Sequence, residues 1–279
     1  MKKVSKIYVA GHEGLVGSAL ERFLRKEGYT NLILRSHSEL ELTNQNEVRK
    51  FFEKEKPEYV FLAAAKVGGI QANINSPAEF IYDNLQIQNN IINFSWKYRA
   101  EKLLFLGSSC IYPRECPQPM KEEFFLTGPF EPTNQPYAIA KSAGIEMCQA
   151  YSKQYGARFI SVIPTNLFGP GDNFDPVNSH LMAALIKKFH EAKSQNKDSV
   201  ILWGTGKPRR ELMYVEDAAK ACLFLMQNYN SPEIINVGVG QDISIGEIAK
   251  QVREAVGFKG DLLYDETKPD GMMRKLLDV

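Results

Sequence analysis

The segment AGHEGLVG, residues 10–17, constrains the fold of this chain more than any other feature. It follows the first apolar run, KIYVA, and opens the amphipathic stretch LVGSALERFLRK, so Gly11, Gly14 and Gly17 lie at a strand–turn–helix junction. Glycine permits the tight turn and the close approach of backbone to a pyrophosphate, and the helix N-terminus offers free N–H groups. The junction therefore predicts a dinucleotide-binding site, against the alternative of a purely structural turn.

Apolar, strand-like runs alternate with helical patterns along most of the chain. Near-continuous apolar strands separated by helices are typical of a parallel sheet covered on both faces. We therefore expect an α/β fold, namely a doubly wound parallel (Rossmann) sheet with a smaller C-terminal substrate lobe. The runs expected to contain strands are 6–11, 31–36, 59–65, 102–109, 158–170 and 234–238.

The pattern loosens after Asn166. Residues 168–180, FGPGDNFDPVNSH, are rich in Gly, Pro, Asn and Asp, which predicts a loop. We expect a dinucleotide-binding domain over residues 1–165, to which 214–239 returns, and a substrate-binding lobe formed by 166–213 and 240–279. No final helix is evident before the end of the sequence, so we expect this lobe to be truncated at its C-terminus.

Composition limits the partners of the protein. A formal net charge of +1 gives no electrostatic reason to expect nucleic acid or an anionic membrane, and no apolar stretch approaches the length of a membrane span. Basic residues cluster locally at 187–188, 207–210 and 274–275, where they suit either a compact anion such as a diphosphate or a solvated surface. The four cysteines show no metal spacing, so we expect no metal site, free thiols and a reducing cytoplasmic location.

Two stretches carry groups suited to acid–base chemistry. GSSCIYP, residues 107–113, delivers Ser108 and Cys110 where a buried strand runs into a loop, and PYAIAK puts Tyr137 and Lys141 four residues apart on one helix face. A free phenol has a pKa of about 10, too high to exchange a proton readily at neutral pH. A neighbouring ammonium lowers a phenol pKa, so we expect Lys141 to do this for Tyr137.

With Ser108, the pair resembles the Ser–Tyr–Lys set of the extended short-chain dehydrogenase/reductase superfamily. The resemblance implies that Tyr137 exchanges a proton with the substrate oxygen while a hydride moves to or from a nicotinamide. It also implies that Ser108 hydrogen-bonds that oxygen, and that Lys141 holds the ribose and acidifies Tyr137.

Longer motifs resemble the GDP-L-fucose synthase family along nearly the whole chain. They are LAAAKVGGI (62–70), FLGSSCIYP (105–113), EPTNQPYAIAKSAGI (131–145), PTNLFGPGDNF (164–174), NSH (178–180), WGTGKPRRE (203–211), KPDG (268–271) and RKLLDV (274–279). The resemblance implies an NADP-dependent epimerase/reductase that converts GDP-4-keto-6-deoxy-D-mannose to GDP-L-fucose, by inverting C3 and C5 and reducing the C4 ketone.

Inversion next to a ketone needs one group to remove a proton and another to return one on the opposite face. The matching family positions, Cys110 and His180, are implied to play base and acid. A free thiol has a pKa of about 8.5, so an adjacent cation or the nicotinamide charge would have to lower it. Read alone, either residue would more simply be packing or solvated.

The same resemblance implies the binding residues. Those implied for the cofactor are Gly11, Gly14, Leu15, Val16, Gly17, Arg35, His37, Ala63, Ala64, Ala65, Lys141, Pro164, Asn166, Leu167 and His180. Those implied for the GDP-sugar are Lys188, Trp203, Arg210, Lys268 and Asp270, although Trp203 alone would equally suit a core.

Two features of the sequence concern the adenosine end of the cofactor, where NADP and NAD differ. No acidic residue follows the second strand, where Arg35-Ser36-His37 stands, and this favours NADP over NAD. Two family arginines that grip the 2′-phosphate are replaced by Glu13 and His37, however, which weakens a strict preference for NADP.

Two alternatives to the epimerase/reductase stay open. One is a C4-reductase of a related GDP-4-keto sugar such as a heptose, without epimerisation. The other is a non-catalytic nucleotide-binding regulatory protein. In the extended branch the helices at about 77–98 and 137–155 commonly pair across a two-fold axis, so we expect a homodimer by analogy.

Overall fold

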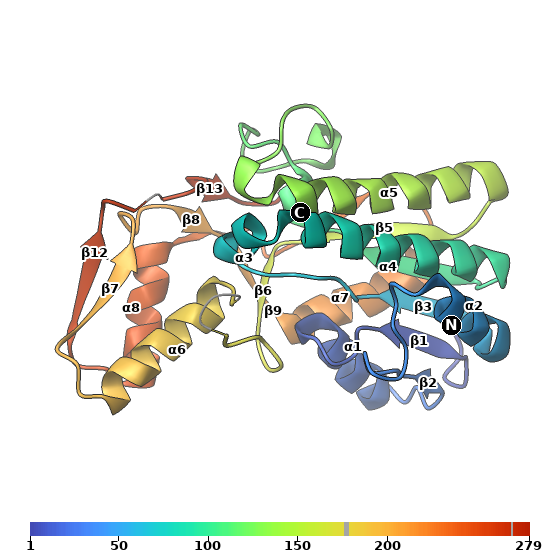
Figure 1. Cartoon of the computed structure of the whole chain (residues 1–279), viewed down its shortest axis with the longest axis horizontal. Coiled ribbons are helices and arrows are strands. Elements are labelled where there is room, and N and C mark those ends of the chain that lie inside the picture. The colour runs from blue at the N-terminus through green and yellow to red at the C-terminus, as the bar shows by residue number, and fades with distance from the viewer. Residues whose placement is uncertain (176–178, 269) are drawn as a thin grey trace.

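The computed structural model describes residues 1–175, 179–268 and 270–279. A parallel sheet of six strands, in the order β10-β5-β4-β3-β1-β2, runs through the larger part of the described chain (Figure 1). Every neighbouring pair in it is parallel, which confirms the predicted doubly wound fold. Its strands are β1 (Ile7–Ala10), β2 (Leu32–Ile33), β3 (Tyr59–Leu62), β4 (Lys102–Leu106), β5 (Phe159–Pro164) and β10 (Ile235–Val237).

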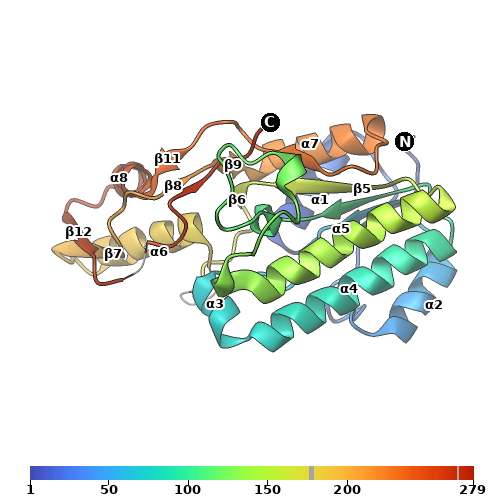
Figure 2. The same cartoon turned by 90° about the horizontal axis from the view of Figure 1, so that it is seen from above.

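Helices cover both faces of this sheet (Figure 2). One layer contains α1 (Leu15–Lys26) and α7 (Val215–Asn228), and the other contains α2 (Gln45–Glu55), α4 (Pro77–Lys97) and α5 (Gln135–Tyr155). Because side chains alternate along a strand, β1 sends Ile7 and Val9 into the first core and Tyr8 and Ala10 into the second. Burial on both faces explains why the strands are apolar without interruption.

A smaller unit beside the large sheet has its own apolar core. Leu185 and Phe189 of α6 pack there with Leu202 of β7 and with Ile248 and Val252 of α8. The division of the chain at residue 165 stays a prediction. The described chain also contains α3 (Ile70–Asn75), β6 (Asn166–Phe168), α6 (Leu181–Ser194), β7 (Ser199–Trp203), β8 (Arg209–Arg210), β9 (Leu212–Tyr214), β11 (Ile243–Ser244), α8 (Ile245–Val256), β12 (Asp261–Asp265) and β13 (Arg274–Lys275).

The strands outside the large sheet form three short sheets of their own among the described residues. β6 pairs with β9, β7 pairs with β12, and β8 lies between β11 and β13. After β13 the chain returns towards the large sheet, where Leu277 pairs with Met120 and the Asp278 N–H donates to the Met120 carbonyl. No helix among the described residues is long and apolar enough to cross a membrane.

Candidate active site

A cleft of about 1910 Å³ lies where the carboxyl ends of β1, β3, β4 and β5 meet the smaller unit. In a doubly wound sheet this edge, where the strand order reverses, is where ligands bind, and the reversal here falls between β1 and β3. With one exception, Lys268, every residue predicted for catalysis, cofactor or substrate lines this cleft. The structure therefore brings together groups from Gly11 to Asp270.

The glycine turn has no room for side chains. Gly11 has φ +83°, and a Cβ there would lie 2.7 Å from the Ala64 backbone. A Cβ on Gly17 would lie 2.0 Å from the Gly11 carbonyl oxygen, so the first turn of α1 packs directly on the loop after β1. The N-terminus of α1, with Gly14 as its N-cap, opens into the cleft and offers its backbone N–H groups there. This cradle fits a dinucleotide pyrophosphate.

The two basic residues near the end of β2 already have carboxylate partners. The Arg35 guanidinium lies 3.1 Å from Glu55 on α2 and also donates to the Leu34 carbonyl. The His37 ring lies 2.9 Å from Glu41. Both residues line the cleft, as do Glu13 and Glu41, so carboxylates share the space predicted for a 2′-phosphate.

Ser108, Tyr137 and Lys141 lie together at the carboxyl end of β4. Ser108 is the N-cap of a 3-10 turn, Ser109–Ile111, and its hydroxyl hydrogen-bonds the Tyr137 phenol. The Tyr137 ring also packs edge-on against Phe80, with centroids 6.3 Å apart. The helix α5 carries Tyr137 and Lys141 on one face, as the four-residue spacing predicts.

The predicted effect of Lys141 on Tyr137 is wrong for this structure. Burial raises the pKa of Tyr137, the Cys110 thiolate raises it further, and only the Ser108 hydrogen bond lowers it. The Lys141 ammonium lies 6.0 Å from the Tyr137 ring centroid and donates to the Leu106 carbonyl at 2.8 Å. Burial also lowers the pKa of Lys141 to about 7, so its charge is only partly present at neutral pH. Tyr137 is therefore a protonated phenol here.

Cys110 carries the thiol of the cleft and has two polar partners on its sulfur. The Asn134 amide donates to Sγ at 3.2 Å, and the Lys275 ammonium lies 3.3 Å from the same atom. Burial raises the pKa of the thiol, but the Lys275 charge and hydrogen bonds with Ser108, Lys275 and Asn134 outweigh it and hold the pKa below its ordinary value. The other three cysteines are free and buried.

His180 is the N-cap of α6 and lines the cleft across from the strand ends. The residue as a whole is exposed, yet withdrawal of its ring from water lowers its pKa. Asp172 raises that pKa and Lys275 lowers it, and the net result is a pKa below the ordinary value. His180 is therefore neutral at pH 7. Asn178 of the predicted NSH motif lies outside the described residues.

Lys275 and Asn134 are the polar groups of this site that the sequence reasoning did not assign. Lys275 belongs to a basic pair and to the RKLLDV motif, and Asn134 belongs to the motif EPTNQPYAIAKSAGI. The sequence indicated that a cation should lie beside Cys110. It did not indicate that a residue of the C-terminal segment would supply that cation. Asn134 Oδ1 is buried without a protein partner, so one acceptor beside Cys110 stays available.

The far end of the cleft gathers the groups predicted for the GDP-sugar. Trp203 is 62% exposed, which excludes the alternative of a core tryptophan. Asp270 accepts from the Thr205 N–H and hydroxyl, and its charge faces Arg210, whose pKa burial lowers. Lys188 donates to the Ile201 carbonyl at 2.6 Å. Lys268 stands outside the cleft wall, with its ammonium 5.7 Å from the Trp203 ring centroid.

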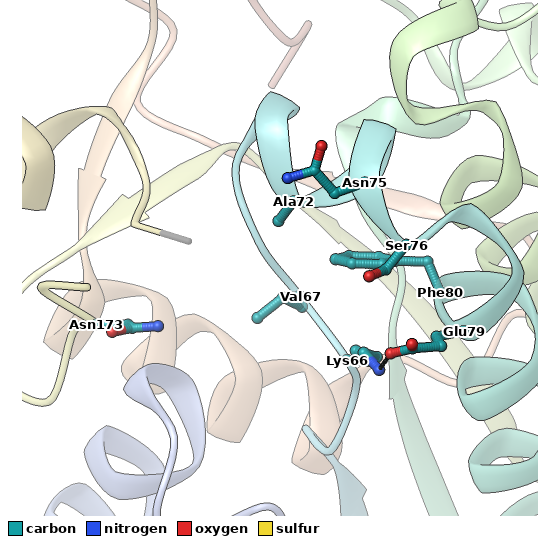
Figure 3. Close-up of a pocket in the computed structure, with 8 residues that line it drawn as sticks. All are labelled: Lys66, Val67, Ala72, Asn75, Ser76, Glu79, Phe80 and Asn173. Atoms are coloured by element: carbon teal, nitrogen blue, oxygen red, sulfur yellow. Dashed lines mark hydrogen bonds and ion pairs between the residues drawn. The ribbon is translucent and has the colours of Figure 1, made fainter. Parts of the chain in front are cut away.

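A smaller hollow of about 440 Å³ adjoins the cleft (Figure 3). The Lys66 ammonium, paired there with Glu79 and Asp83, and the Phe80 ring line both spaces. The Asn84 side chain accepts from the Lys66 N–H and donates to the Lys66 carbonyl, each at 3.0 Å. This double contact fixes the chain after β3, next to the ring that supports Tyr137.

Comparison with known proteins gives a consistent result. A sequence profile described as the NAD dependent epimerase/dehydratase family matches residues 7–238. Putative GDP-L-fucose synthase 2 of Arabidopsis thaliana is 58% identical over 278 residues, which are 100% of this chain and 85% of that protein.

Two solved structures are also close in shape. A GDP-6-OMe-4-keto-L-xylo-heptose reductase from C. jejuni has a TM-score of 0.95 and 39% identity, with 100% of this chain and 91% of that chain covered. A GDP-L-fucose synthetase from Naegleria fowleri, bound to NADP, has a TM-score of 0.92 and 31% identity, with 100% of this chain and 86% of that chain covered.

Proposed function

Because the chain belongs to the NAD dependent epimerase/dehydratase family, we propose that it converts GDP-4-keto-6-deoxy-D-mannose to GDP-L-fucose as an NADP-dependent epimerase/reductase. The 58% identity to a plant protein named as a GDP-L-fucose synthase supports this assignment. The observation that carries it is the placement of Cys110 beside Ser108 and Tyr137 in one cleft, with Lys275 on the sulfur.

The residues around the glycine turn fit the proposed cofactor. Gly11 and Gly17 leave space that any side chain would fill, and the N-terminus of α1 supplies N–H donors for the pyrophosphate. NADPH bound there supplies the hydride for C4. Arg35 and His37 are the basic residues proposed for the 2′-phosphate, and their carboxylate partners compete for that contact, so we propose a preference for NADP that is not strict.

Tyr137 acts as the proton donor for the reduction. Its raised pKa keeps the phenol protonated at neutral pH, which is the form needed to protonate the C4 oxygen as the ketone is reduced. Ser108, which already hydrogen-bonds the phenol, is placed to share that oxygen. The buried Lys141 stays next to both groups and holds the ribose.

Cys110 and His180 carry out the inversions. The ketone acidifies the C–H bonds at C3 and C5, and the Cys110 thiolate removes a proton to give an enolate. His180, which is neutral at rest, first takes up a proton from solvent and then delivers it to the other face from the opposite side of the cleft, while the proton on Cys110 passes to solvent. The low pKa that Lys275 gives to Cys110 supports the role of base.

The exposed Trp203 and the cations Arg210 and Lys188 form the proposed GDP subsite. An indole offers an aromatic surface to the base, and the two cations offer charge to the diphosphate. A lysine at position 188 acts as a point charge, where an arginine would grip two oxygens at once. Asp270, anchored by Thr205, completes this subsite.

One alternative has an observation in its favour. The heptose reductase with a TM-score of 0.95 is named only as a reductase, so a C4-reductase without epimerisation fits the same fold. We also propose a homodimer through α4 and α5, because Tyr82, Trp96 and Tyr155 on these adjacent helices are exposed. A cytoplasmic location stays a prediction.

The test is incubation with GDP-4-keto-6-deoxy-D-mannose and NADPH, or NADH, followed by NMR of the product. GDP-L-fucose with oxidation of NADPH supports the proposal. A product reduced at C4 but not inverted supports the reductase alternative. Binding of NADPH without its oxidation would support a non-catalytic protein and exclude both enzymes.

A further inference from the structure

Residues Arg274–Asp278 form a segment that joins the two parts of the molecule, and we call it the C-terminal strap. It begins as β13, parallel to β8 in the smaller unit, and it ends against Met120 beside the large sheet. Lys275 lies in the strap, so its position beside Cys110 depends on how the strap is held. The contacts of the strap therefore affect the acidity of the Cys110 thiol, which is far away in sequence.

Glu211 holds the strap from inside the protein. Its side chain is completely buried, and one carboxylate oxygen accepts from the Leu277 N–H at 2.9 Å. The other oxygen accepts from the N–H groups of Val239 and Gly240 in the loop after β10. The Glu211 backbone N–H donates to the Lys275 carbonyl at 3.2 Å, so this residue contacts the strap at Lys275 and again at Leu277.

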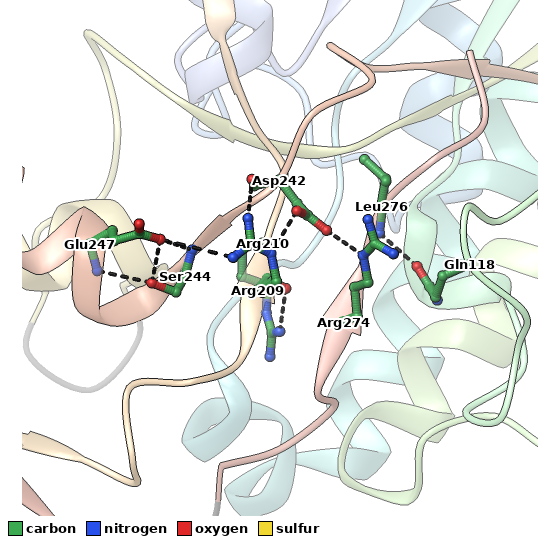
Figure 4. Close-up of polar contacts among 8 residues, drawn as sticks. All are labelled: Gln118, Arg209, Arg210, Asp242, Ser244, Glu247, Arg274 and Leu276. Atoms are coloured by element: carbon green, nitrogen blue, oxygen red, sulfur yellow. Dashed lines mark hydrogen bonds and ion pairs between the residues drawn. The ribbon is translucent and has the colours of Figure 1, made fainter.

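Two further anchors lie on either side of Lys275 (Figure 4). Asp242, whose side chain is 6% exposed, accepts from Arg274 Nε at 2.5 Å and from Arg209 Nε at 2.7 Å. Gln118 accepts from the Leu276 N–H at 2.9 Å. These contacts hold the strap at Arg274 and at Leu276, the neighbours of Lys275. Without them, the Lys275 side chain could move away from the sulfur.

We propose that Glu211 is a positioning residue, which fixes the C-terminal strap so that Lys275 stays beside the Cys110 sulfur and keeps it ready to take a proton. The catalytic consequence rests on the proposed function, whereas the effect on the thiol does not. A buried carboxylate that accepts three N–H groups is well satisfied, and removal of its charge leaves at least one donor unpaired. The unpaired donor would weaken the attachment of the strap, whose Leu277 N–H is one of the three.

The charged and titratable groups that face Cys110 are few among the described residues. Lys275 comes from the strap and Tyr137 from α5, while His180 and Asp172 lie near Lys275 on the other side of the cleft. Lys275 is the cation that lowers the thiol pKa. A strap that shifts would remove this cation from the sulfur and leave the effect of burial, which raises the thiol pKa.

The variant that tests this is Glu211→Gln. The amide keeps the size of the side chain and retains one acceptor oxygen, but its NH2 group must face at least one N–H donor. Glu216→Gln is the matched control, because Glu216 pairs with Arg22 on α1 and does not contact the strap. Lys275→Met gives the largest effect that loss of the cation can produce.

The measurement is the pH dependence of Cys110 alkylation by iodoacetamide, followed by peptide mass spectrometry on the full chain without substrate. We expect E211Q to move the profile to higher pH and to slow alkylation at pH 7 by about 3- to 10-fold, as a rise of up to one pKa unit would. E216Q should match the wild type. An E211Q profile that also matches the wild type, while K275M shifts it, would overturn the proposal.

If E211Q fails to fold, Asp242→Asn is the second test. It weakens the contact that holds Arg274 of the strap, so it should shift the alkylation profile in the same direction. An unshifted D242N profile would then overturn the proposal. The experiments distinguish failure of the positioning role from failure of the proposed function. A shifted thiol profile without any epimerisation by the wild type would contradict the function, and epimerisation with an unshifted E211Q profile would contradict the positioning role.

Discussion

The Lys275 ammonium and the Cys110 sulfur lie 3.3 Å apart, although 165 residues separate them in the chain. The contact joins the end of a strand in the large sheet to the C-terminal strap. An ammonium at this distance favours the thiolate over the thiol, and little water lies between the groups to screen it. The acidity of Cys110 is therefore a property of the tertiary structure, and several predictions about the proposed reaction depend on it.

Lys275→Met should move the activity of Cys110 to higher pH. The thiolate forms as the pH rises through the thiol pKa, which Lys275 holds below its ordinary value, so loss of the ammonium leaves burial to raise it. Exchange of the C3 and C5 hydrogens with solvent should then slow by about 10-fold or more at pH 7 and recover as the pH rises. An exchange rate with unchanged pH dependence would contradict this.

Tyr137→Phe should separate the two halves of the reaction. The phenol is placed to protonate the C4 oxygen, so its loss should lower the rate of NADPH oxidation by about 10²- to 10⁴-fold. Hydrogen exchange at C3 and C5 should persist, because Cys110 keeps Asn134 and Lys275 as partners. Cys110→Ser is the reciprocal variant, which should lose exchange. Equal loss of both activities in Y137F would argue against separate roles.

Glu55→Gln should strengthen the preference for NADPH over NADH. Glu55 occupies the Arg35 guanidinium at 3.1 Å, and its neutral replacement would leave that cation freer to meet a 2′-phosphate. We expect the ratio of kcat/KM for NADPH to that for NADH to rise by about 3- to 10-fold. Glu53→Gln, on the same helix but paired with Arg49, is the control and should leave the ratio unchanged. A fall in the ratio for E55Q would contradict the role of Arg35.

Lys141 should make the stability of the cofactor-free protein depend on pH. Burial lowers its pKa from 10.5 to about 7, so between these values the unfolded chain binds more protons than the folded one. Stability then rises with pH across this window. The difference in melting temperature between wild type and Lys141→Met should therefore grow in favour of the wild type from pH 7 to pH 10. A difference that is constant or shrinks would contradict the lowered pKa.

Local patterns predicted the fold correctly, and most residues predicted for the site line one cleft. The uninterrupted apolar runs at Ile7–Ala10 and Lys102–Leu106 are strands because both faces of the sheet are covered, and this is visible in the sequence alone. Gly11, Ser108 and Pro164 lie at or just after the carboxyl ends of their strands, and all three line the cleft at that edge of the sheet.

The failures concern electrostatics between distant segments. The four-residue spacing of Tyr137 and Lys141 predicted a helix face correctly, but it could not reveal that Lys141 turns to the Leu106 carbonyl and loses charge through burial. The spacing also could not show that Lys275 reaches Cys110, because that contact depends on how Glu211 and Asp242 hold the strap. Lys268 matched a family motif, yet its ammonium lies over the Trp203 ring and it does not line the cleft.

The most direct test of the account is incubation of the protein with GDP-4-keto-6-deoxy-D-mannose in deuterium oxide without NADPH. The account predicts deuterium at both C3 and C5 of the sugar, because Cys110 and His180 exchange these hydrogens independently of reduction. The recovered sugar would be analysed by NMR, with Cys110→Ser as the control that should incorporate none. A wild-type protein that binds this sugar and leaves both positions fully protonated would contradict the central claim.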